Sequence, residues 1–274
     1  MGSLDLSALS LATWDAADDT RRRALAADVA AHVGGELIDL EIDAQGGQLH
    51  RIAAIDVRGV HMVLVPGATV TLGWDPSRAH GLTETQVQLL AAADDGGAPF
   101  TELLPVYLSP TRTVTLAPFL LEVSPVSISS WVDELADTDD LLAGVAARVA
   151  TGGFRLPTDD EWEHAARGGT STFFRWGDIW PDGIPFARET HFTAHHVPSA
   201  FGVRLLDDPY QVEVVSDPLG FRGGDGGSAV CGGRPSPEAW LTFASAFRWP
   251  RDLWEDVIDV SLGSGWVRRA LSLT

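Results

Sequence analysis

Three histidines lie close together in the second half of the chain, at His191, His195 and His196. His191 and His195 are four residues apart and would share one face of a helix, where two imidazoles and a carboxylate can bind zinc or iron. Thr193 and Pro198 favour a loop instead, and short histidine motifs often match by chance. The segment therefore has two interpretations, and we favour loop histidines over a metal site. Bound zinc or iron that is lost in His191→Ala and His195→Ala would reverse that preference.

A single cysteine, Cys231, is the only other side chain that suggests covalent chemistry. No intrachain disulfide can form, which favours a reducing compartment. A lone cysteine is either a nucleophile or an inert buried thiol, and the inert case is the commoner one. No Ser-His-Asp arrangement, phosphate-cradling loop or dinucleotide fingerprint can be picked out. We therefore predict no catalytic residue.

The strongest local signals surround Thr158. Thr158 is followed three residues later by Glu161, which is the spacing of a capping box at the start of a helix. Gly168 can adopt the left-handed conformation that ends a helix. The pattern predicts a short helix between these residues. Its buried face is expected to carry Trp162, Ala165 and Ala166.

The run from Gly153 to Gly169 resembles the signature R-L-P-T-E-x-E-W-E-x-A-A-R-G-G of the formylglycine-generating-enzyme and sulfatase-modifying-factor family. Further segments are similar to other motifs of that family: Met62 to Gly73, Pro118 to Ser124, Phe174 to Asp178, Ser199 to Val203, Val212 to Asp217, Val230 to Gly233, Ala246 to Arg248 and Gly265 to Val267. The resemblance implies an α+β, C-type-lectin-like fold, irregular, with two flanking helices and short antiparallel sheets.

The resemblance divides the chain in two. Residues 1–58 are expected to form an N-terminal extension of one helix, up to Val33, followed by strands. Residues 59–274 would form the domain similar to sulfatase-modifying factors. An insertion at about 74–107 interrupts it and contains a second capping box, Thr83 with Gln86. The role of this insertion is open.

The redox chemistry of the family would require residues that are missing here. Its oxidases bind copper through two cysteines that follow a Gly-Gly pair, and those places fall at Pro237 and Thr242. We therefore expect no copper site of the cysteine-pair type and no conversion of a Cys-containing sulfatase peptide, which mass spectrometry can check. Its iron-dependent sulfoxide synthases use a separate helical bundle, for which residues 1–58 are too few.

A calcium site is a further possibility that the resemblance raises. Relatives bind calcium through a G-N-x-W-E-W element, in which Glu213 matches the Glu, whereas Tyr210 stands at the Asn position and Val212 and Val214 replace the two Trp. The cofactor is therefore unknown, with a calcium or a transition-metal ion as candidates. The candidate metal ligands are His191, His195, His196 and Glu213.

We predict a catalytically degenerate domain that acts as a binding or scaffold protein for a protein or small-molecule partner. Exposed Trp with Arg is typical of binding hot spots, although any single Trp is more often buried. The candidate ligand-binding residues are Arg234, Trp240, Arg248, Trp249 and Trp254. The alternative is a divergent metal-dependent oxidative or sulfur-modifying enzyme that uses the same cleft. A variable ligand-displaying protein ranks last, because the C-terminal loops lack the necessary Asn and Tyr.

The composition limits the kinds of partner. The formal net charge is −19 and the pI is about 4.6, which argues against nucleic acid and anionic membranes because both require a basic surface. The chain shows no signal peptide and no apolar run long enough to span a membrane. We therefore expect a cytoplasmic protein.

Overall fold

The computed structural model describes residues 5–41, 44–45, 48–49, 52–77, 81–93, 99–131, 135, 141–185, 191–216, 220–249 and 265–273. Its α-helices are α1 (Leu11–Ala16), α2 (Asp19–Val33), α3 (Glu84–Ala92), α4 (Phe100–Tyr107), α6 (Leu141–Thr151), α7 (Asp159–Arg167), α8 (Ser228–Cys231) and α9 (Ser236–Trp240). Single 3-10 turns are η1 (Leu6–Leu9), η2 (Ile128–Trp131), η3 (Ala194–His196) and η4 (Leu241–Phe243). The strands are β1 (Glu36–Glu41), β2 (Ala44–Gln45), β3 (Gln48–Leu49), β4 (Ile52–Val57), β5 (Val60–Val65), β6 (Ala68–Leu72), β7 (Arg112–Leu116), β8 (Phe119–Glu122), β9 (Val126–Ser127), β10 (Val212–Val215), β11 (Gly220–Gly223), β12 (Gly265–Val267) and β13 (Ala270–Ser272).

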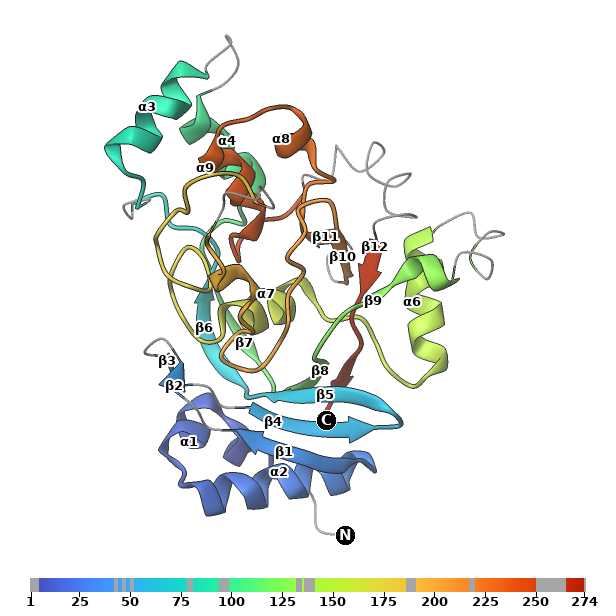
Figure 1. Cartoon of the computed structure of the whole chain (residues 1–274). Coiled ribbons are helices and arrows are strands. Elements are labelled where there is room, and N and C mark those ends of the chain that lie inside the picture. The colour runs from blue at the N-terminus through green and yellow to red at the C-terminus, as the bar shows by residue number, and fades with distance from the viewer. Residues whose placement is uncertain are drawn as a thin grey trace.

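Two sheets form the framework (Figure 1). The five-stranded sheet has the order β1-β4-β5-β8-β13 and is antiparallel throughout. β4 turns directly into β5 through Arg58 and Gly59, both with positive φ, as a two-residue hairpin turn requires. The expected boundary between residues 58 and 59 therefore lies within one sheet, because β1 and β4 precede it and β5, β8 and β13 follow it. The four-stranded sheet has the order β11-β10-β12-β9, and its β10 and β12 are parallel.

The helix predicted after Thr158 is confirmed as α7. Both bonds of the capping box form: Thr158 Oγ1 accepts from the Glu161 N–H, and the Glu161 carboxylate accepts from the Thr158 N–H at 2.9 Å. Gly168 ends the helix with φ of 61°. Trp162, Ala165 and Ala166 are buried, as the helical spacing predicted. α7 packs beside the antiparallel pair of β6 and β7, near the centre of the molecule (Figure 1).

Buried ion pairs connect α7 to the four-stranded sheet. Arg222 on β11 pairs with Asp159 at 2.6 Å and with Glu163 at 3.2 Å. Burial, the largest single effect, would raise the pKa of Asp159, but the charge and hydrogen bonds of Arg222 and the charges of Arg112 and Arg248 together outweigh it and hold that pKa below its usual value. Glu213 on β10 pairs with Arg268 at 2.9 Å and accepts from Trp162 Nε1 at 3.0 Å. These contacts position α7 over the sheet.

The segment 74–107 forms two helices at one end of the molecule. The second capping box, Thr83 with Gln86, is confirmed at the start of α3. Gln86 is buried, and its side-chain amide is satisfied there: Nε2 donates to Trp180 O and Asp182 Oδ1, both at 3.0 Å. Figure 1 shows α3, α4, α8 and α9 gathered at this end, whereas α1 and α2 lie against the five-stranded sheet at the other.

The fold is thus mixed α and β with short, mainly antiparallel sheets. α6 and α7 lie where the two flanking helices were expected. Among the described helices, none is both long enough and apolar enough to cross a membrane.

Candidate functional site

A cavity of about 630 Å³ lies between α4, α8, α9 and the segment that ends at Trp249. Apolar side chains form much of its wall, and several charged or polar groups converge on it, a combination typical of small-molecule sites. The lining residues are Ala93, Phe100, Leu103, Tyr107, Asp225, Ser228, Ala229, Gly232, Gly233, Arg234, Pro235, Glu238, Leu241, Thr242, Phe247 and Trp249. We call this space the α4 cavity.

Aromatic rings are fixed on one side of the α4 cavity. Tyr107, the last residue of α4, stacks on Phe247 with ring centroids 5.9 Å apart and an interplanar angle of 11°. Trp249 Nε1 donates to Gly224 O at 2.8 Å, which holds the indole in place. Because these rings are held by their neighbours, the wall is already formed without a ligand.

Charged groups also line the α4 cavity. Arg234 and Glu238 form an i,i+4 pair with an N–O distance of 3.6 Å. Asp225 is 8% exposed, and burial raises the pKa of its carboxyl. Hydrogen bonds donated by the Gly227 and Ala229 N–H groups lower this pKa, but their effect is smaller than that of burial. Two carboxylates and one guanidinium therefore line the space.

One cavity-lining hydroxyl has no partner among the described residues. Thr242 is 4% exposed, and its buried Oγ1 makes no hydrogen bond to the part of the chain that the structure describes. Buried hydroxyls are normally satisfied, and an orphan one calls for a partner such as water or a ligand atom. Thr242 also stands at one of the two positions where the oxidases have cysteine, and Pro237, at the other, is buried as well.

The structure separates the predicted ligand-binding residues. Arg234 and Trp249 line the α4 cavity together, as expected of neighbours in a site. Trp240 is fully buried among aromatic side chains, and its Nε1 donates to Gly183 O at 2.8 Å, which is the buried position that the sequence analysis named as the commoner one for any single Trp. Arg248 is half-buried and bonds through its N–H to Tyr107 O, without lining the cavity. Trp254 lies outside the described residues.

The histidine cluster does not assemble with Glu213. His191 is exposed in irregular structure, and His195 and His196 lie in the 3-10 turn η3 rather than on a helix. His196 Nδ1 lies 2.7 Å from Asp207 Oδ2, while Glu213 is held by Arg268 and Trp162. Within the described ranges, no three His, Cys, Asp or Glu side chains come together in an arrangement that could hold a metal ion. The predicted ligand set is therefore not brought together.

Cys231 is exposed and lies beside the α4 cavity rather than in its wall. Its Sγ is 3.0 Å from the hydroxyl of Tyr210. This hydrogen bond is the main cause of a raised pKa of the Tyr210 phenol. Both side chains are exposed, and neither lines the α4 cavity.

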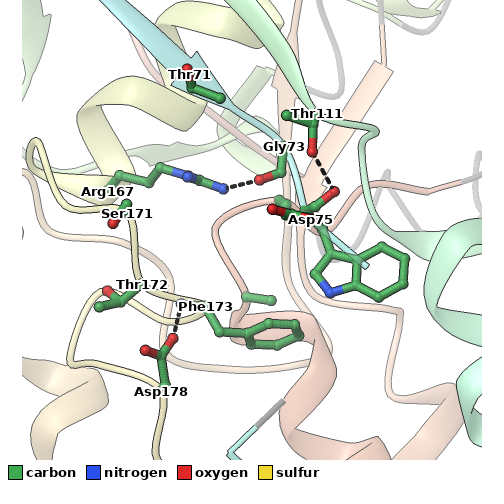
Figure 2. Close-up of a pocket in the computed structure, with 12 residues that line it drawn as sticks. Thr71, Gly73, Asp75, Thr111, Arg167, Ser171, Thr172, Phe173 and Asp178 are labelled. Atoms are coloured by element: carbon green, nitrogen blue, oxygen red, sulfur yellow. Dashed lines mark hydrogen bonds between the residues drawn. The ribbon is translucent and has the colours of Figure 1, made fainter. Parts of the chain in front are cut away.

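A second cavity, of about 130 Å³, lies beside the C-terminal end of α7 (Figure 2). Its polar groups are turned toward the backbone of its own walls. Arg167 Nη2 donates to Gly73 O at 2.5 Å, and Asp178 Oδ1 accepts from the Phe173 N–H at 2.7 Å (Figure 2). These contacts serve to hold the wall together. The α4 cavity is therefore the better candidate for a ligand site.

The sequence missed the part of the α4 cavity that comes from the segment 74–107, namely Ala93, Phe100, Leu103 and Tyr107. Phe100 and Tyr107 belong to α4, for which no function was assigned. The available signal was the clustering of apolar residues in a short segment, which predicts burial but not what the segment packs against. Contacts between residues far apart in the chain, such as Tyr107 with Phe247, supply that information.

No protein-family model matches the chain, and the curated proteins give no significant match. The function has to be inferred from the α4 cavity and from the motifs of the sequence.

Proposed function

We propose that this protein binds a small organic molecule in the α4 cavity, and that the molecule carries an aromatic or other flat apolar body and a basic group. The observation that carries the proposal is the cavity of about 630 Å³, whose described lining includes fixed aromatic rings and the carboxylates of Asp225 and Glu238. A space of this size accommodates a drug-sized ligand. The rings provide apolar contact, and the carboxylates provide orientation.

The charge of the cavity favours a cation. Among the described lining residues, the carboxylates of Asp225 and Glu238 outnumber the guanidinium of Arg234, and the whole chain has a formal charge of −19. A protein field of this sign concentrates cations and repels anions. A bound ammonium group would also stabilise the ionised form of the Asp225 carboxyl, whose pKa is raised by burial. Aromatic faces add to the attraction for an organic cation.

We further infer that the fold is the C-type-lectin-like fold of sulfatase-modifying factors, in a catalytically degenerate form. The support is the run from Gly153 to Gly169, with α7 formed where the signature predicts it, and the order of the remaining motifs along the chain. Pro237 and Thr242 replace the copper-binding cysteines, so binding rather than oxidation is the activity that the remaining groups can support. This function does not depend on a metal ion at the histidines.

The proposal is tested with two probes that share a ring but differ in charge, benzylamine and benzoate. Their binding is followed by ligand-detected NMR and by tryptophan fluorescence at constant ionic strength. We expect benzylamine to bind with a Kd of about 1 mM, as is usual for a fragment of this size, and benzoate to bind about tenfold more weakly. Glu238→Gln should reduce the difference. Equal affinity for the two probes, or no binding of either, would contradict the proposal.

A further inference from the structure

The wall of the α4 cavity contains a guanidinium that a simple amine would not use. Arg234 and Glu238 both line the cavity, and Arg234 Nε lies 3.6 Å from Glu238 Oε2. This distance is longer than a hydrogen bond. The side chain of Arg234 is 42% exposed and that of Glu238 is 14% exposed. A ligand group in the cavity can therefore contact both side chains at once.

The closeness of these two charges restricts the ligand. An ammonium group that binds Glu238 also comes close to the guanidinium of Arg234, because the two side chains form an ion pair. Like charges at such a separation repel each other. A carboxylate on the same ligand, placed next to its ammonium group, would pair with Arg234 and offset this repulsion. The ligand that fits the pair best is therefore a zwitterion with adjacent charges.

An α-amino acid has this arrangement, because its ammonium and carboxylate groups are attached to the same carbon atom. Bound antiparallel to the ion pair, it would place its ammonium group at Glu238 and its carboxylate at Arg234. The planar guanidinium of arginine matches a carboxylate with two parallel hydrogen bonds. A peptide is a poorer fit, since its two terminal charges are separated by at least one amide group.

We propose that the α4 cavity binds a free amino acid with an aromatic side chain, whose charged head group lies on Arg234 and Glu238. This inference rests on the proposed function and adds a carboxylate to the ligand. The aromatic side chain would pack against Tyr107 and Trp249, whose rings are held by Phe247 and by the backbone of Gly224. The cavity of about 630 Å³ also leaves room for water around the head group.

Asp225, the other carboxylate among the described lining residues, has a different environment. Its Oδ1 accepts from the Gly227 N–H at 2.8 Å, and its Oδ2 accepts from the Ala229 N–H at 2.9 Å. Both oxygens thus hold the backbone at the start of α8. Glu238 is the carboxylate that lies beside a guanidinium, so we assign the ammonium group of the amino acid to Glu238.

The test uses the purified full-length protein and three probes that share a phenyl ring on a two-carbon chain: L-phenylalanine, 2-phenylethylamine and 3-phenylpropanoate. Ligand-detected NMR titrations at pH 7 and constant ionic strength give each Kd. L-Phenylalanine should bind about tenfold more tightly than 2-phenylethylamine, the gain typical of a charged hydrogen-bonded contact. 3-Phenylpropanoate should bind most weakly, because it lacks the ammonium group.

Two variants of the ion pair test the assignment of the head group. Arg234→Gln should weaken L-phenylalanine binding about tenfold and should strengthen 2-phenylethylamine binding, because a positive charge leaves the wall. Glu238→Gln should weaken the binding of both probes. The matched control is Arg23→Gln, which changes an exposed arginine on α2, at the other end of the molecule, and should keep the preference for L-phenylalanine.

The outcomes separate this inference from the proposed function. If 2-phenylethylamine binds in the α4 cavity and L-phenylalanine binds no more tightly, the inference is overturned and the amine site remains. A preference for L-phenylalanine that persists in Arg234→Gln also overturns it, because the carboxylate would then be bound elsewhere. If neither benzylamine nor 2-phenylethylamine binds, both the inference and the proposed function are wrong.

Discussion

Tyr107 and Phe247 lie in segments far apart in the sequence, yet their rings stack with an interplanar angle of 11° and form part of one wall of the α4 cavity. The contact joins the end of α4 to the segment that leads to Trp249. The C-terminal Arg and Trp residues identified in the sequence therefore form a cavity only together with the segment 74–107. Substitutions in this segment should therefore affect ligand binding as much as substitutions near Trp249 do.

Tyr107→Ala should weaken benzylamine binding at least about tenfold, because it removes one ring of the wall and the support of Phe247. Val106→Ala is the matched control, since Val106 precedes it on the same helix and is 49% exposed. Titration by ligand-detected NMR measures both. Equal binding by the two variants would place the probe elsewhere.

Arg268→Met should destabilise the protein by about 3–5 kcal/mol, because it leaves the buried Glu213 carboxylate without its cation. Asp19→Asn removes a surface ion pair with Arg22, in which the Asp19 side chain is 78% exposed, and should cost less than about 1 kcal/mol. Urea unfolding gives both free energies. A loss below about 1 kcal/mol for Arg268→Met would show that Glu213 is accommodated in another way.

Gly168→Ala and Gly34→Ala compare two helix ends that share a left-handed conformation, with φ of 61° and 66°. A Cβ at Gly168 would lie 2.6 Å from Ala200 N, whereas one at Gly34 would meet nothing within 4 Å. Gly34→Ala should cost about 1 kcal/mol for the backbone alone, and Gly168→Ala should cost about 1–3 kcal/mol more. Chemical denaturation measures the difference. Equal losses would mean that the loop at Ala200 moves away freely.

His164 should make the protein less stable in acid. Burial, with a smaller effect of Arg167, lowers the pKa of His164 to about 4, despite a hydrogen bond to the Pro66 backbone. Between about pH 6.5 and pH 4 the unfolded chain binds the proton and the folded chain does not, so stability falls as the pH falls through this range. The full effect is about 3 kcal/mol.

The variant His164→Phe, which can keep the ring contact with Phe201, should lose less stability between pH 7 and pH 4.5 than the wild type. Denaturant unfolding at several pH values measures both slopes, and above pH 7 the two slopes should agree. Parallel curves throughout this range would show that His164 does not titrate with a lowered pKa.

Features encoded by neighbouring residues were predictable from the sequence. The capping boxes at Thr158 and Thr83 are confirmed, because the residues that form them are three positions apart and need no tertiary context. The positive φ of Gly168 was also predictable, because a glycine directly after a helix commonly adopts the left-handed conformation.

Features that depend on contacts between distant segments were not predictable. Trp240 was a candidate ligand-binding residue with burial as the alternative, and the sequence could not decide between them because the aromatic cluster around it comes from segments near Phe174 and Phe192 as well as its own. Glu213 was expected to bind a metal ion, and the sequence could not show that Arg268 would reach it. Nothing in the local pattern around Arg175 indicates that this residue would be buried.

The most direct test of ligand binding in the α4 cavity is a crystal structure of the wild-type protein soaked with benzylamine. We predict that the ring lies against Trp249 and Tyr107, with the ammonium group within hydrogen-bond distance of the Asp225 or Glu238 carboxylate. An empty α4 cavity at a concentration that saturates the solution titration, with the probe bound at another place, would contradict this function.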